Sequence, residues 1–287
     1  MKVSCLQENL AKGLTIVSRA VASRSTLPVL GNVLIATDQG RLKLVATNLE
    51  LAVTCWIGAK VDEDGATTVP ARVLSDFVNS LPPERIDMEL NVRTQTLHLK
   101  CARYDANIKG IDATEFPIIP TIADSKKISL EPETLREMIE QVTFAAATDE
   151  SRPVLTGVIA RFEKEKITFA AADGFRLSVR HATLSTPVDQ PISVIIPAKA
   201  LQEVARVSGD QEEPIEMAVT ENKSQVLFRL TNIEIVSQLI DGVFPDFTRI
   251  IPESHVTRTV VTTSDLRSAV KASSVFAREA MNTVCVQ

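Results

Sequence analysis

Residues 68–74 read Thr-Val-Pro-Ala-Arg-Val-Leu, and residues 195–201 read Ile-Ile-Pro-Ala-Lys-Ala-Leu. In both stretches an apolar, β-branched run is followed by Pro-Ala, a basic residue and a helix-like sequence. Proline suits the first turn of a helix because its φ is fixed and its missing N–H would have no intrahelical partner. Each stretch therefore predicts a strand that leads directly into a helix, and their likeness predicts an internal repeat.

Two further pairs of motifs recur in the same order. Residues 112–117, Asp-Ala-Thr-Glu-Phe-Pro, resemble residues 241–245, Asp-Gly-Val-Phe-Pro. Residues 46–51 resemble residues 171–177 in the same way. The two copies in all three pairs are separated by nearly the same number of residues. Solenoid repeats span about 20–50 residues, so this much longer period indicates a duplicated domain.

Both copies have the same predicted order of elements. A strand (2–6 or 126–130) leads into an amphipathic helix, whose buried face in the second copy is marked by Leu135, Met138, Ile139 and Val142. Three strands are then expected, near 28–37, 41–47 and 50–59 in the first copy and near 154–162, 166–172 and 175–183 in the second. Another strand, the Pro-Ala helix and three more strands complete each copy. Each domain is thus two β-α-β-β-β units, an α+β fold with sheet on one side and two helices on the other.

The repeat predicts three domains along the chain, at 1–122, 123–252 and 253–287. The third is expected to be incomplete. Residues 256–261 have the β-branched composition of a strand. Residues 264–279 resemble the first helix of the earlier copies, so the sequence is expected to end early in a third domain.

Composition narrows the class of protein. The chain is 45% hydrophobic and 23% charged, which is typical of a globular protein. Its beginning shows no signal-peptide pattern, and no apolar run is long enough to span a membrane, so we expect a cytoplasmic protein. The four cysteines are widely separated and predict neither a zinc site nor a disulfide framework. The formal net charge of −5 by itself argues against nucleic-acid binding, which requires basic side chains.

Catalytic motifs are missing from the sequence. It contains no Walker loop, no GxGxxG motif after a strand, no HExxH and no GxSxG elbow. The three histidines, His98, His181 and His255, are isolated from one another. The sequence therefore predicts a protein that is not an enzyme, with no catalytic residues, no metal and no cofactor. A nucleotide-processing hydrolase with dispersed active-site residues remains an alternative, as does an interaction scaffold of duplicated domains.

Four motifs together closely resemble one family. They are residues 24–32, Arg-Ser-Thr-Leu-Pro-Val-Leu-Gly-Asn, and residues 69–72, 172–177 and 241–247. Bacterial DNA sliding clamps, the beta subunits of DNA polymerase III, have similar motifs in the same order and spacing. The resemblance extends over essentially the whole chain. It implies clamp domains that form a ring, with sheets outside and helices inside, through which duplex DNA passes while the replicative polymerase is tethered for processive synthesis.

The resemblance also implies a DNA-facing surface. A ring can be acidic outside and basic inside, which removes the objection from net charge. Double-stranded DNA would be bound without regard to sequence, through basic side chains of the inner helices and their flanks. The implied residues are Lys12, Arg19, Arg24, Arg72, Arg136, Lys199, Arg206, Arg267 and Lys271.

A peptide pocket and an assembly follow from the same resemblance. The implied partners are the DNA polymerase III alpha subunit, the clamp loader, and other polymerases and repair proteins. The implied pocket residues are Leu155, Asp173, Gly174, Phe175, Arg176, Leu177, Pro245, Arg249 and Ile250. Many relatives have histidine in place of Phe175 and threonine in place of Ala172, so the site is expected to be more apolar here. The full-length form is expected to be a head-to-tail homodimer, and the chain as given to be mostly monomeric.

Overall fold

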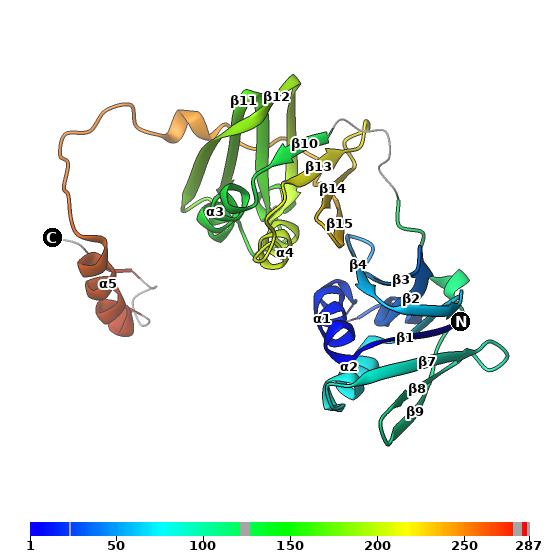
Figure 1. The fold of residues 1–287 in the computed structure, drawn as a ribbon. Coiled ribbons are helices and arrows are strands. Elements are labelled where there is room, and N and C mark those ends of the chain that lie inside the picture. The colour runs from blue at the N-terminus through cyan, green and yellow to red at the C-terminus, as the bar shows by residue number, and fades with distance from the viewer. Residues whose placement is uncertain (23, 121–126, 278–282, 286–287) are drawn as a thin grey trace. The chain divides into compact units, whose positions relative to one another are not determined.

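The computed structural model describes residues 1–22, 24–120, 127–277 and 283–285 (Figure 1). The chain forms two compact units, Met1–Phe244 and Pro245–Gln287. The predicted domain boundary between residues 122 and 123 lies outside the described residues, so the domain limits stay a prediction.

The first repeat has the predicted element order, with one additional short strand. Helix α1 buries Leu10, Leu14 and Val17, and α2 buries Leu74 and Val78, at the spacing of one helical face. The elements are β1 (Lys2–Leu6), α1 (Gln7–Val17), β2 (Asn32–Asp38), β3 (Arg41–Thr47), β4 (Leu51–Gly58), the additional β5 (Lys60–Glu63), β6 (Ala66–Pro70), α2 (Ala71–Ser80), β7 (Arg85–Asn91), β8 (Thr96–Cys101) and β9 (Tyr104–Lys109).

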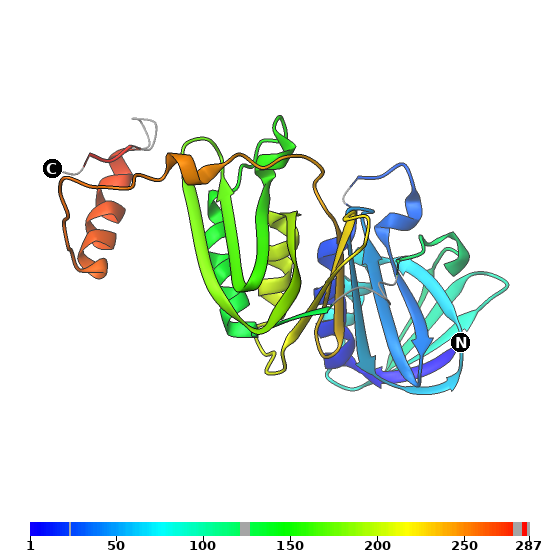
Figure 2. The same cartoon turned by 90° about the horizontal axis from the view of Figure 1, so that it is seen from above.

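The second repeat also has two helices, and two of its strands are much longer than any strand of the first repeat. Its elements are β10 (Lys127–Leu130), α3 (Pro132–Val142), β11 (Gly157–Ala172), β12 (Leu177–Pro197), α4 (Ala198–Val207), β13 (Ile215–Val219), β14 (Gln225–Arg229) and β15 (Ile233–Gln238). The predicted face of α3 is confirmed, because its four apolar residues are buried. In Figure 2 helices α3 and α4 lie behind the strands of this repeat. The α+β fold with helices on one side of the sheet is therefore confirmed.

The separate strands predicted at 154–162 and 166–172 are joined into β11. Residues 157–162 pair with 192–197, and residues 166–172 pair with 177–183. Between them Lys164 has a φ of 52° and pairs with Val188, with a register shift on either side. The pairing of β11 with β12 therefore shifts its register around Lys164 within one strand, which a pattern of local hydrophobicity does not reveal.

One sheet runs through both repeats. Its strand order is β10-β13-β14-β15-β4-β3-β2-β6, so β15 of the second repeat pairs directly with β4 of the first. A five-stranded sheet, β5-β1-β7-β8-β9, completes the first repeat. A single cluster of buried apolar side chains extends from Met1 to Ile235 and packs beneath the helices of both repeats.

The second unit contains the helix α5 (Thr263–Ala277), which confirms the helix predicted at 264–279 as far as the described residues go. The strand predicted at 256–261 is wrong, because these residues form no regular element. A β-branched run forms a strand only where a partner supplies hydrogen bonds. No described segment of the chain pairs with it.

The shared sheet predicts that the Met1–Phe244 unit unfolds cooperatively. Ile235 is fully buried and pairs with Val53 across the β15–β4 seam. Substituting Ile235→Ala in the second repeat should cost about 2–4 kcal/mol. Trp56 fluorescence reports on the first repeat, and circular dichroism reports on the whole unit. The substitution should shift the urea midpoint by the same amount with either probe. If Ile235→Ala does not change the urea midpoint measured by Trp56 fluorescence, the two repeats unfold separately.

Candidate functional site

The tip of the β11–β12 hairpin is organised by a single carboxylate. Asp173 accepts hydrogen bonds from the backbone N–H groups of Phe175 (2.9 Å) and Arg176 (3.0 Å), and from Nε of Arg176 (2.9 Å). The two backbone N–H donors hold the pKa of Asp173 below its ordinary value. Gly174 has a φ of 96°, a conformation that glycine adopts without strain. The closed turn leaves the Phe175 side chain 98% exposed.

Arg152 also contacts this turn, and no sequence motif predicted it. Its guanidinium donates a hydrogen bond to the carbonyl oxygen of Asp173 at 3.1 Å. A Cβ added to Gly174 would lie 3.3 Å from Nη1 of Arg152, so the guanidinium packs closely against the turn. Every residue has a backbone carbonyl. The sequence therefore does not indicate that Arg152 contacts the carbonyl of Asp173, which lies far from it along the chain.

Leu155 and Leu177 supply apolar surface near the hairpin. Leu155 lies in a short 3-10 helix, Pro153–Thr156, which packs against β11. The side chain of Leu155 is buried. Leu177 begins β12 and is half-buried. The structure therefore gathers the predicted residues Asp173 to Leu177 on one turn, with Leu155 on the element next to it.

The other three predicted pocket residues lie in the second unit. Pro245 lies just before a 3-10 turn, Phe247–Ile250. Asp246 caps this turn and accepts hydrogen bonds from the hydroxyl and the backbone N–H of Thr248. These bonds lower the pKa of Asp246. Arg249 forms an ion pair with Asp246 at 3.0 Å, and both Arg249 and Ile250 are exposed. The turn therefore presents one basic and one apolar side chain to solvent.

The predicted DNA-facing residues lie on helices or beside them. Lys12, Arg72, Arg136, Lys199 and Arg206 lie on α1 to α4. Arg19 lies in the 3-10 turn Ser18–Ala20 after α1, and Arg24 lies in the loop that follows. Arg136 and the side chain of Arg206 are partly covered, and the other five are exposed. We call the surface of the Met1–Phe244 unit formed by α1, α2, α3 and α4 the helix side. Arg267 and Lys271 are exposed on α5 in the second unit.

Several of these cations have a carboxylate beside them. Each of three exposed cations on the helix side has an exposed acidic partner at the long end of ion-pair distance. These pairs are Lys12–Asp210 at 3.7 Å, Arg72–Asp76 at 3.7 Å and Lys199–Glu150 at 4.0 Å. Exposed pairs of this kind contribute at most about 1 kcal/mol, so these side chains are not fixed in place.

Arg206 is held differently from the other cations. Its guanidinium donates to Oε2 of Glu203 at 2.7 Å and to the carbonyl oxygen of Ile16 at 3.2 Å. Ile16 belongs to the last turn of α1, where helix carbonyls commonly lack an intrahelical partner. This turn carries no basic residue of its own. The Arg206 side chain is only 33% exposed. It therefore caps α1 of the first repeat from α4 of the second.

The Ile16 contact predicts a structural role for Arg206. Substituting Arg206→Ala should destabilise the Met1–Phe244 unit by about 1–3 kcal/mol, because the variant cannot form the charge-assisted hydrogen bond across the junction. Lys199→Ala is the matched control on the same helix, and it should change stability by no more than about 0.5 kcal/mol. Urea unfolding measures both values. Equal stability of the two variants would contradict the capping role.

The described residues hold no group of three or more His, Cys, Asp or Glu side chains that could bind a metal ion. His98 pairs with Asp105 at 2.8 Å on the surface, and Nδ1 of His181 lies 2.9 Å from the hydroxyl of Thr168. Burial raises the pKa of Cys5 to about 12 and that of Cys55 to about 11, so both remain thiols. Within the described part of the chain, no helix is both long and apolar enough to span a membrane.

Comparison with known proteins identifies the family. Residues 1–120 match the N-terminal domain, and residues 129–246 the central domain, of the DNA polymerase III beta subunit. The chain is 31% identical to the beta sliding clamp of Bacillus subtilis (strain 168), over 99% of this chain and 76% of that protein. It is 34% identical to the beta sliding clamp of Synechocystis sp., over 99% of this chain and 77% of that protein.

Solved structures agree with this assignment. The crystal structure of the Bacillus subtilis DNA polymerase sliding clamp superposes with a TM-score of 0.92 and 30% identity, over 97% of this chain and 75% of that one. A sliding clamp of Pseudomonas aeruginosa bound to griselimycin superposes with a TM-score of 0.89 and 29% identity, over 96% of this chain and 74% of that one. The chain belongs to the family of bacterial DNA polymerase III beta subunits, the beta sliding clamps.

Proposed function

We propose that this protein acts as a DNA sliding clamp that encircles duplex DNA with its helix side and tethers the replicative polymerase for processive synthesis. The observation that supports it most is the junction of the two repeats. There β15 pairs with β4 on the sheet, and Arg206 of α4 reaches α1 on the helix side. The helices of both repeats thus lie on one surface, which carries five of the predicted basic residues.

The chemistry of this surface suits binding that is independent of sequence. Most of its cations are exposed Lys and Arg side chains, which attract phosphates at any base sequence. Base-specific contacts would oppose sliding, and long side chains held only by weak ion pairs can move from one phosphate to the next. In this proposal the protein provides no catalysis and acts only by binding.

The DNA contact predicts a selective effect of charge reversal. Lys12→Glu combined with Lys199→Glu should weaken binding of a short labelled duplex about tenfold or more at low salt, measured by fluorescence anisotropy. The slope of log K against log salt should fall by about 0.9 for each phosphate that the variant no longer neutralises.

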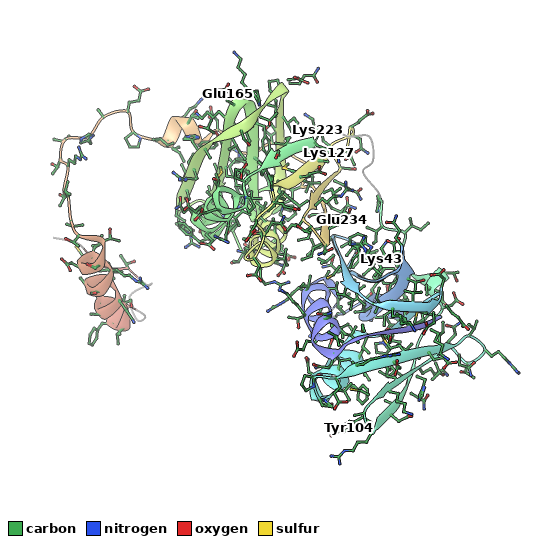
Figure 3. The ribbon with its side chains drawn as sticks, viewed as in Figure 1. Lys43, Tyr104, Lys127, Glu165, Lys223 and Glu234 are labelled. Carbon is green, nitrogen blue, oxygen red and sulfur yellow. The ribbon has the colours of Figure 1, made fainter. Side chains whose placement is uncertain are left out.

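The matched control changes the same net charge elsewhere. Lys164→Glu combined with Lys223→Glu alters an exposed residue within β11 and an exposed residue in the turn between β13 and β14. Lys223 lies away from α3 and α4 (Figure 3). This control should bind DNA as the unsubstituted chain does. If both double variants lose affinity equally, the helix side is not the DNA contact, and an interaction scaffold without DNA encirclement becomes the better interpretation.

We further propose that the β11–β12 hairpin docks short peptide segments of partner proteins. The partners would be the DNA polymerase III alpha subunit, the clamp loader, and other polymerases and repair proteins. The exposed Phe175 ring and the half-buried Leu177 offer apolar contact, while Arg176 and Arg152 offer orienting donors. Leu155 would add apolar surface, and the turn at 245–250 stays a predicted part of the pocket.

Leu177 provides a test of the peptide pocket. Leu177→Lys should weaken binding of a labelled peptide with leucine and phenylalanine anchors by about 2–4 kcal/mol, because a charge would replace an apolar contact. Ser185→Lys adds the same charge at an exposed position of the same strand and should leave affinity unchanged. Fluorescence polarisation measures both variants. An unchanged affinity for Leu177→Lys would remove the hairpin from the pocket.

The proposed assembly of the full-length form is a head-to-tail homodimer. Strand β9 lies at one edge of the five-stranded sheet, so its outer backbone groups are available to a strand of another chain. Tyr104, at the start of β9, is exposed at that edge (Figure 3).

A further inference from the structure

The helix side carries acids in direct contact with the cations that are proposed to bind DNA. Lys12 lies 3.7 Å from Asp210, and the two side chains are 73% and 95% exposed. Lys199 with Glu150 and Arg72 with Asp76 show the same arrangement. Three proposed DNA contacts are therefore already occupied by a carboxylate of the protein itself.

Phosphate and carboxylate compete for the same ammonium or guanidinium group. The Lys12–Asp210 pair is exposed and screened by water, so it opens readily. When Lys12 moves to a phosphate, Asp210 loses its partner and lies close to a polyanion, which repels it. Both effects reduce the free energy gained from the DNA contact.

We propose that Asp210, together with Glu150 and Asp76, is a displaceable counterion that limits the affinity of the helix side for DNA. These carboxylates hold the cations in the absence of DNA and yield them to phosphates in its presence. The inference rests on the proposed function, since it concerns the strength of that DNA contact. The acids keep each contact weak, so that a cation released by one phosphate returns to a carboxylate until the next phosphate approaches.

Asp210 is the best placed of the three acids. It lies in the turn after α4, and that turn is fixed on both sides of it. The carbonyl oxygen of Gly209 accepts a hydrogen bond from Arg136 of α3 at 3.4 Å, and Oε1 of Gln211 accepts one from the hydroxyl of Thr231 at 3.1 Å. The backbone thus holds Asp210 opposite Lys12 of the first repeat while its carboxylate remains free to release the ammonium group.

Glu203, which lies on α4, contrasts with these three acids. Its partner Arg206 is also bonded to the carbonyl of Ile16, and both side chains of the pair are largely covered. Removing the charge of Glu203 would leave Arg206 bound to α1 and would not release a cation to DNA. The counterion role is therefore confined to the exposed pairs.

Charge neutralisation tests the inference. Asp210→Asn and Glu150→Gln retain side-chain size and should each raise the affinity for a short labelled duplex about two- to five-fold at low salt, by fluorescence anisotropy. Glu165→Gln makes the same change of charge at an exposed residue away from α3 and α4 (Figure 3) and should have no effect. Glu203→Gln should not raise the affinity.

A double-mutant cycle separates competition for Lys12 from the general field of the acid. In a Lys12→Gln background, Asp210→Asn should raise affinity less than it does in the unsubstituted chain. If Lys12→Gln weakens DNA binding but Asp210→Asn has no effect, or acts no differently from Glu165→Gln, the counterion role is overturned and the proposed DNA contact stands. If Lys12→Gln leaves DNA binding unchanged, the proposed contact fails at this residue, and the inference for Asp210 fails with it.

Discussion

The antiparallel pairing of β15 with β4 is the interaction on which the rest of the structure depends. Residues 233–237 pair with 51–55, and the N–H of Trp56 extends the ladder to the carbonyl of Asn232 at 2.9 Å. On one face of this seam Ile235 and Val53 join the main core. On the other face Val236 and Ala52 pack with Ile119. A shift of one residue would exchange the two faces, so burial on both sides fixes the register.

The seam brings the helices of both repeats to one surface. Once β15 lies beside β4, α4 can reach α1, and Arg206 donates a hydrogen bond to the carbonyl oxygen of Ile16 in the last turn of α1. The same proximity places Asp210 beside Lys12. The helix side therefore combines cations and acids in pairs. Neither the formal net charge of −5 nor a count of basic residues describes the electrostatic field of such a surface.

The hairpin at 172–177 is a structural turn that also carries the proposed peptide-binding surface. Asp173 and Gly174 form a tight turn, as the dipeptide predicts. Because the carboxylate of Asp173 ties the turn to itself, Phe175 is left in solvent with no core contact to make. An exposed aromatic ring on a rigid turn is suited to an apolar partner.

The sequence by itself determined the α+β class and most element positions, because these depend on periodicities within about ten residues. It also determined the repeat, because three pairs of motifs recur in the same order. The four predicted apolar residues of α3, all buried, and the Pro-Ala start of α4 illustrate this. The family was also evident from motifs in a fixed order. The predicted site residues could be named from sequence, but their partners could not.

Tertiary structure decided what depends on residues far apart in the chain. It joined two predicted strands in β11, left residues 256–261 without strand structure, placed Arg206 against Ile16 and placed Arg152 against Asp173. In the last two contacts a guanidinium meets a backbone carbonyl, which every residue possesses, so no pattern of side chains indicates the pairing. Strand pairing likewise requires a neighbour with unpaired backbone groups, and only the folded chain determines which strands are neighbours.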